Sequence, residues 1–147
     1  MKPTVTDIEL AIEYAQAGNN PTTISRVRSG WVFLALNQVL RGCCLLVADP
    51  VTSSIEDLDD TRRQQFIDDM LLTGKAIKKV TGAARINYLV LGNKDPVLHV
   101  HIIPRFSDEP DEYKSHGPWK YENYVKFDTE RDTPLIEQLR VEIEQEM

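Results

Sequence analysis

One stretch of the chain, residues 97–105 with the sequence VLHVHIIPR, limits the choice of fold more than any other. Its apolar residues alternate with His99 and His101, and successive side chains of a β-strand point to opposite faces of a sheet. The pattern predicts a strand with Leu98 and Val100 packed in a core. Both imidazoles then leave the other face, roughly 7 Å apart along the strand. That face is therefore assigned to histidine chemistry.

Helical and extended patterns follow one another along the chain in an order typical of an α+β protein. Runs of strand-forming residues predict strands at residues 22–27, 31–36, 43–47, 85–91 and 97–106. Apolar residues at helical spacing predict helices at residues 8–16, from about 56–61 to Gly82, and from Pro134 onward. Most connections are too short for parallel crossovers. We therefore expect a five-stranded antiparallel sheet flanked by a long helix and a shorter N-terminal helix, with the first three strands in a meander.

Length and composition favour one soluble domain. The chain has 147 residues, 41% hydrophobic and 27% charged, which is close to the average for globular domains. We expect a core at about 22–106 and a C-terminal tail and helix at about 107–147. The net charge of −6 offers no basic surface for nucleic acid. No signal-peptide pattern and no membrane-spanning apolar run is found, so a cytoplasmic protein with no membrane partner is expected.

The two cysteines, Cys43 and Cys44, are neighbours in an apolar run. A strand would point them to opposite faces, which makes a disulfide or a shared metal site awkward. We expect both to be buried and unreactive.

The pair His99 and His101 has three interpretations. An imidazole with a pKa near 6.5 is a neutral nucleophile at pH 7, and it can attack phosphorus while the second ring assists the leaving group. The two rings could instead bind a metal ion, with His116 or a carboxylate completing the site. They could also be ordinary histidines of a sheet. The spacing alone does not decide between these interpretations.

The wider sequence resembles the histidine triad (HIT) family. Residues 98–105 are similar to the second and third histidines and the tail of its signature, His-φ-His-φ-His-φ-φ, where φ is apolar. The positions of Asn37, Gly42 and Gly92-Asn93 also agree, so the resemblance covers about 32–105. Residues 117–119, Gly-Pro-Trp, resemble the tail of a bacterial branch that also lacks the first histidine.

The resemblance implies a homodimer with a continuous antiparallel sheet and no required cofactor or metal. It also implies hydrolysis or transfer of nucleoside monophosphates through a nucleotidyl-histidine intermediate. By position, His99 matches the nucleophile and His101 the histidine that contacts the phosphate and assists the leaving group. Val97 stands in place of the first histidine. It keeps the backbone carbonyl through which that position helps to orient the nucleophile.

Three further residues are candidates for nucleotide binding. Asn37 matches a ribose-contacting Asn or Asp, and Asn93 lies where the family usually has a phosphate-contacting Gln. Lys94 could add a cation for phosphate. Arg105 is most simply a cation at a strand end, and Trp119 is more often a packing or dimer contact than a lid over a base.

Three functions remain open. The first is a HIT-type nucleotide hydrolase or transferase acting on a dinucleoside polyphosphate, a related phosphate ester or a phosphoramidate. The second is a non-catalytic, nucleotide-binding regulatory dimer, suggested by Val97 and Asn93. The third is a metal-binding protein that uses His99 and His101.

Overall fold

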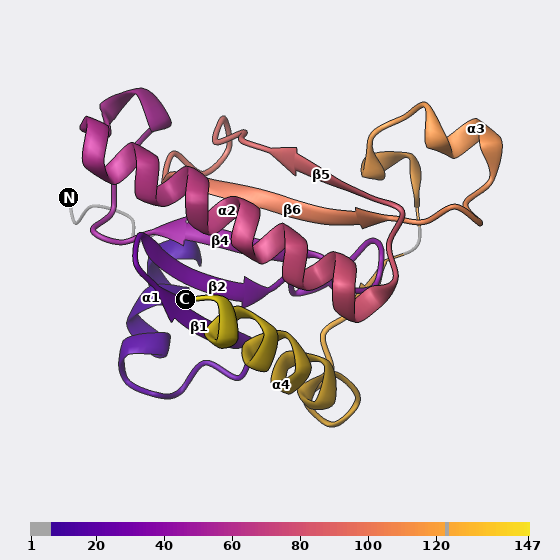
Figure 1. Ribbon diagram of the computed structural model, residues 1–147, viewed down its shortest axis with the longest axis horizontal. Helices are drawn as coiled ribbons and strands as arrows, with labels where there is room; N and C mark the ends of the chain where they lie inside the picture. Colours follow the sequence, from indigo (N-terminus) through magenta and orange to yellow (C-terminus); the bar gives the residue numbers. More distant parts are fainter. Residues whose placement is uncertain (1–6, 123) are drawn as a thin grey trace.

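The computed structural model describes residues 7–122 and 124–147. Its main element is a five-stranded antiparallel sheet with the strand order β1-β2-β4-β6-β5 (Figure 1). The strands are β1 (Thr23–Val27), β2 (Gly30–Leu34), β4 (Cys44–Ala48), β5 (Arg85–Leu89) and β6 (His99–Arg105). The α+β fold, the antiparallel sheet and the meander of the first three strands are confirmed.

Helices cover both faces of this sheet. On one face α2 (Asp60–Thr81) packs against β4, β5 and β6, and α4 (Thr129–Glu146) packs against β1 and α2 (Figure 1). The main core lies under these two helices and includes Leu46, Val100 and Ile102. On the opposite face α1 (Asp7–Gln16) contributes to a smaller apolar cluster formed by Ile12, Ala15, Phe33, Val47 and Val97.

The ends of α2 follow from local sequence. The side chain of Asp59 accepts a hydrogen bond from the backbone N–H of Arg62, which caps the first turn. At the other end Gly82 has φ of 74°, a left-handed conformation that glycine adopts without steric cost. The predicted end of the long helix at Gly82 is confirmed.

The C-terminal helix begins earlier than its apolar pattern indicated. It starts at Thr129, so Pro134 lies inside it, and the predicted start at Pro134 is wrong. Asp128 caps the first turn by accepting from the N–H of Arg131, and the buried Asp132 anchors it. Because these contacts are polar, this turn carries no hydrophobic periodicity.

The hairpin between β1 and β2 depends on a close approach of two backbones. Val27 pairs with Gly30, so Arg28 and Ser29 form the turn. A Cβ atom on Gly30 would lie 1.8 Å from the carbonyl oxygen of Val47. Only glycine fits here, because β4 runs directly alongside.

A second, two-stranded sheet joins β3 (Asn37–Gln38) to β7 (Val125–Lys126), which brings the C-terminal segment against the loop between β2 and β4. Gln38 is buried and fixes that loop. Its amide nitrogen donates to the carbonyls of Ala35 and Cys43, and its amide oxygen accepts from the N–H of Gly42. The remaining short helices are η1 (Ile55–Asp57), α3 (Asp111–Lys114) and η2 (Pro118–Lys120).

Both cysteines are buried and free, as predicted. Burial raises the pKa of the Cys43 thiol to about 11 and that of Cys44 well above its ordinary value. Thiols with raised pKa values are poor nucleophiles at neutral pH.

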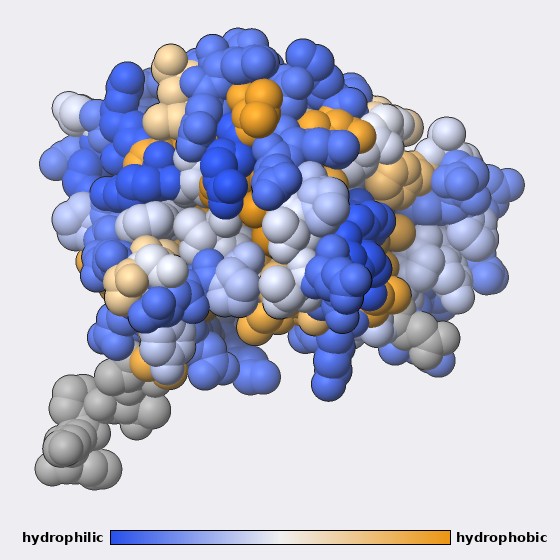
Figure 2. Space-filling model, turned by 90° about the horizontal axis from the view of Figure 1, so that it is seen from below, coloured by the Kyte–Doolittle hydropathy of each residue, from blue (hydrophilic) through white to orange (hydrophobic). Residues whose placement is uncertain are grey.

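Polar side chains predominate on the face shown in Figure 2, with hydrophobic ones in small groups. Within residues 7–122 and 124–147, no helix combines the length and the apolar character that crossing a membrane requires.

Candidate active site

The two histidines of β6 lie on the face of the sheet that carries α1. His99 pairs with Val47 of β4, and His101 pairs with Leu45 of β4 and with Leu89 of β5. Val47 belongs to the apolar cluster under α1. The alternate residues Leu98, Val100 and Ile102 are buried in the core under α2 and α4. The predicted division of the strand into a packing face and a histidine face is confirmed.

His99 is held by the backbone just before it. His99 is 6% exposed, and its Nδ1 atom lies 2.6 Å from the carbonyl oxygen of Val97. A carbonyl oxygen can only accept a hydrogen bond, so this contact assigns the proton of the neutral ring to Nδ1. Nε2 then carries a free lone pair, and the neutral ring is a nucleophile at that atom.

His101 is half-buried and lies beside His99, with ring centroids 5.0 Å apart and ring planes at 70°. Burial, followed by the neighbouring His99, lowers the pKa of His101 below its ordinary value of 6.5. Two imidazolium rings this close would repel each other. His101 is therefore mainly neutral at pH 7.

A tryptophan from the C-terminal tail completes this group of rings. The Trp119 ring centroid lies 6.5 Å from that of His101, and the two planes meet at 76°. Trp119 follows Pro118, which is buried at the start of η2, yet it is itself 52% exposed. The sequence favoured packing or a dimer contact for Trp119, and nothing in VLHVHIIPR indicates that it would reach His101.

A cavity of about 410 Å³ opens beside His101. Apolar side chains from α1, β2 and β4 form most of its wall, including Ile8, Ala11, Phe33, Leu45 and Val47. Its size and apolar lining with a few polar groups are typical of sites for small ligands.

The cavity includes some of the nucleotide-binding candidates and leaves out others. Asn37 lines it, together with Pro118, Trp119 and His101. Asn93 and Lys94 are exposed in the loop between β5 and β6, and neither is among the lining residues. Both lie in the residues that lead into β6.

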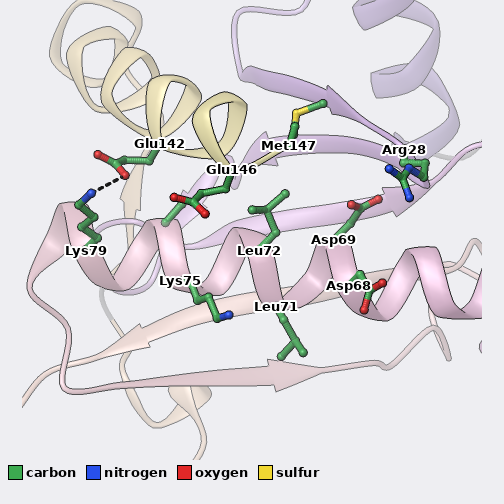
Figure 3. Close-up of a pocket in the computed structure, with 11 residues that line it drawn as sticks. Arg28, Asp68, Asp69, Leu71, Leu72, Lys75, Lys79, Glu142, Glu146 and Met147 are labelled. Atoms are coloured by element: carbon green, nitrogen blue, oxygen red, sulfur yellow. Dashed lines mark ion pairs between the residues drawn. The ribbon is translucent and has the colours of Figure 1, made fainter.

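A larger cavity of about 610 Å³ lies between α2 and α4 (Figure 3). Its wall carries charges of both signs, and Lys79 and Glu142 form an ion pair of 3.0 Å across it. None of the histidines lines this cavity. Size alone therefore does not identify the site. His101 lines the smaller cavity, and His99 is not among its lining residues but lies directly beside His101.

Metal binding by the histidine pair receives no support from its surroundings. Among the residues that the structure describes, no group of three His, Cys, Asp or Glu side chains is placed to hold a metal ion. His116 does not join the pair: its Nδ1 atom contacts the carbonyl of Glu112 and the hydroxyl of Ser115.

Arg105 has a larger part than the sequence indicated. It is buried on the same face of β6 as His99 and His101, and it binds the tail that carries Trp119. The spacing 99, 101, 103, 105 placed Arg105 on that face. The tail that meets it has no periodicity, so its partners were not predictable.

Comparisons with known proteins agree with this fold. No protein-family model matches the sequence, and a search of curated proteins finds no relative. Among solved structures, a histidine triad protein from Bradyrhizobium japonicum has 26% sequence identity and a TM-score of 0.72, over 83% of this chain and 91% of its own.

Two further solved structures share the fold at lower identity. A histidine triad protein from Marinobacter aquaeolei is 21% identical with a TM-score of 0.73, over 84% of this chain and 90% of its own. A hypothetical histidine triad nucleotide-binding protein from Sulfolobus tokodaii is 20% identical with a TM-score of 0.73, over 92% of both chains. The chain therefore shares the fold of histidine triad proteins, and these similarities support its membership of that family.

Proposed function

We propose that the protein is a nucleotide-phosphate hydrolase or nucleotidyl transferase that works through a nucleotidyl-histidine intermediate on His99. The observation that carries the proposal is the 2.6 Å contact between His99 Nδ1 and the Val97 carbonyl. In the neutral ring this contact places the proton on Nδ1 and the lone pair on Nε2, and it fixes the ring before substrate arrives. Such preorganisation lowers the cost of reaching the transition state.

The reaction has two displacements at phosphorus. In the first, the lone pair of His99 Nε2 forms a bond to phosphorus, and the bond to the leaving group breaks with its electron pair. The ring becomes cationic while Nδ1–H stays bonded to the Val97 carbonyl, which stabilises that charge. In the second, water attacks the same phosphorus, the N–P bond breaks, its electron pair returns to Nε2, and a proton is released.

His101 supports these steps as a hydrogen-bond donor. Its lowered pKa keeps the ring mainly neutral, and a neutral imidazole still offers one N–H to a phosphate oxygen or the leaving oxygen. A polyphosphate leaving group departs as an anion without needing a proton, whereas an amine must be protonated. A dinucleoside polyphosphate or related phosphate ester suits this site, and a phosphoramidate needs a proton from water.

The cavity beside His101 is proposed as the nucleoside site. Its apolar wall suits a base, and Asn37 offers an amide to the ribose hydroxyls. We assign Asn93 and Lys94 to the phosphates, which they would reach from their exposed loop. The nucleotide-binding description of the Sulfolobus tokodaii protein supports a nucleotide as the ligand.

We also propose that the protein works in the cytoplasm as a homodimer joined at the edge strand β5. The other edge, β1, is covered, because Arg140 of α4 donates to the carbonyls of Ile24 and Thr23. Beside β5 the apolar side chains of Leu71, Val90 and Leu91 are exposed. An uncovered strand edge with apolar neighbours favours pairing with a second copy.

A non-catalytic nucleotide-binding dimer is the second candidate. The observation that favours it is Val97, which packs in the cluster under α1 where the family signature has an imidazole. Turnover decides between the two. A panel of dinucleoside polyphosphates, adenosine phosphoramidate and nucleotide sugars, assayed at neutral pH, should include one substrate that wild type and His116→Ala cleave and His99→Ala does not. Binding without turnover on the whole panel would favour the second candidate.

A further inference from the structure

A buried ion pair that the proposed chemistry does not use lies at the end of β6. Arg105 Nε donates to both carboxylate oxygens of Glu109 at 3.1 Å, and one terminal nitrogen donates to Glu109 and to the carbonyl of Tyr113. The other donates to Asn87 at 3.0 Å and to the carbonyl of His116 at 2.9 Å. An arginine has five N–H groups, so every one has a partner here.

Glu109 is equally well occupied. Besides Arg105, it accepts from the hydroxyl of Tyr121 at 2.7 Å and from the backbone N–H of Phe106 at 2.6 Å. Burial would raise the pKa of its carboxyl, but the hydrogen bonds from Arg105, Tyr121 and Phe106 outweigh burial and lower it. Glu109 is therefore an anion at neutral pH. We call the side chains of Arg105, Glu109 and Tyr121 the clamp.

The clamp joins both ends of the tail segment 106–121. This segment, with α3, extends beyond the end of β6 (Figure 1). Its last turn carries Pro118 and Trp119, both of which line the cavity beside His101. Tyr121 follows directly after that turn and is bound to Glu109. The position of Trp119 is thus set by hydrogen bonds two residues away.

The fixed position of Trp119 is not explained by burial of its own side chain. Trp119 leaves about half of its surface in solvent, so its own burial contributes little to holding the segment. A buried ion pair is also a weak source of net stability, because both ions lose their hydration. Its better-supported use is to select one conformation. The conformation selected here places an aromatic surface at the cavity.

We propose that the clamp is a positioning unit that holds Pro118 and Trp119 as a wall of the nucleoside cavity and thereby sets the affinity for the nucleotide. The inference rests on the proposed function for the identity of the ligand. It assigns no catalytic role to the clamp, since none of its side chains lines the cavity. Its effect should reach the ligand through Trp119.

The test removes one hydroxyl. Tyr121→Phe deletes the hydrogen bond to Glu109 and keeps the ring, and Tyr113→Phe is a matched control. The Tyr113 ring packs against Tyr121 with centroids 4.7 Å apart, but its hydroxyl makes no hydrogen bond among the described residues. AMP is the probe. Tyr121→Phe should weaken AMP binding and raise KM about threefold to tenfold, with kcat changed less than about twofold. Tyr113→Phe should match wild type.

A double-mutant cycle tests whether the clamp acts through Trp119. In a Trp119→Leu background, Tyr121→Phe should cause no further loss of AMP affinity, because the wall it positions is gone. Independent, additive losses would overturn the proposal, as would AMP affinity in Tyr121→Phe equal to that of Tyr113→Phe.

Fluorescence separates this inference from the proposed function. The chain has two tryptophans, so Trp119 is the only tryptophan in a Trp31→Phe background and can be excited selectively over tyrosine. Acrylamide should quench Trp119 more strongly in Tyr121→Phe than in Tyr113→Phe, whether or not the protein binds AMP. Equal quenching in the two variants would refute the positioning role of the clamp, even if the enzyme is active. Stronger quenching in Tyr121→Phe, in a protein that binds no AMP, would support the positioning of Trp119 by the clamp and refute the nucleotide site.

Discussion

His99 Nδ1 lies 2.6 Å from the carbonyl oxygen of Val97, two residues earlier in the chain. The group that orients His99, the proposed nucleophile, is therefore part of the backbone, and it stays in place when residue 97 is not histidine. Val97→Ala should keep turnover within about threefold of wild type, although losing buried methyl groups should cost about 2 kcal/mol of stability. Assays below the unfolding temperature, with melting curves alongside, check this. A hundredfold loss of kcat in a folded Val97→Ala would contradict it.

The dependence of kcat/KM on pH below neutrality should reflect the protonation of His101. Because burial and His99 lower its pKa below 6.5, the neutral donor form persists into mildly acidic solution. We expect kcat/KM to be level from about pH 6.5 to 8, where His101 stays a neutral N–H donor, and to change only at lower pH, where His101 becomes a charged donor. His101→Gln, which keeps an N–H donor that does not titrate, should remove the part of that change that comes from His101. A rate that declines steadily as pH rises from 6 to 8 would instead show that a protonated His101 is required.

Asn37 should affect binding more than chemistry. Since it lines the cavity as a neutral amide, Asn37→Ala should raise KM about fivefold with little change in kcat, the effect expected when uniform binding is lost. Asn19→Ala is the control, because Asn19 is exposed and does not line the cavity. Steady-state kinetics on both variants test this prediction. A lower kcat with unchanged KM in Asn37→Ala would contradict the assignment of Asn37 to the ribose.

Asp132 should be a main source of stability for α4. Its buried carboxylate accepts from Arg41, Arg131 and the N–H of Asp128, and the hydrogen bonds, with that from Arg131 foremost, hold its pKa well below 3.8. Asp132→Asn should cost about 2 kcal/mol or more in urea unfolding at pH 7. Asp111→Asn, at a fully exposed side chain, should not differ measurably from wild type.

The difference in unfolding free energy between wild type and Asp132→Asn should depend on pH in a definite direction. A carboxyl whose pKa is depressed by folding stabilises the protein above its unfolded pKa, and the contribution is lost as pH falls through the folded value. The gap between wild type and Asp132→Asn should therefore narrow below about pH 3.8. A gap that widens in acid would contradict this assignment.

The proposed dimer should depend on the apolar surface beside β5. Leu91→Arg places a charge on this surface and should give a monomer in sedimentation velocity, because burying an unpaired charge is costly. Val141→Arg, at an equally exposed apolar position on α4, should leave the association state of wild type unchanged. A monomeric wild type, or a dimer that survives Leu91→Arg, would refute the interface.

The sheet was predictable because its strands carry strong local patterns. Alternation in β6 identified both faces of that strand, and Gly82 marked the end of α2. By contrast, β3 and β7 have two residues each, too few for any periodicity to show. The start of α4 was missed because its first turn is held by polar contacts of Asp128 and Asp132.

The site was predictable only where its residues share one strand. His99 and His101 come together because they are two apart in β6, and the Val97 carbonyl follows from the same geometry. Trp119 lies beside His101 on the tail segment bound by the clamp, in which Tyr121 and Glu109 are hydrogen-bonded although they lie 12 residues apart in the chain. Such contacts depend on how the tail folds back, which no spacing in the sequence expresses.

The central claim is that His99 Nε2 forms a covalent bond to a nucleotide phosphorus. Its most direct test is rapid acid-free quenching of enzyme with a cleaved substrate, followed by mass spectrometry of peptides that contain residues 99–105. The account predicts one added nucleoside monophosphate on His99 in wild type and in His116→Ala, and none in His99→Ala. A nucleotide adduct on His101, or one that persists in His99→Ala, would contradict it.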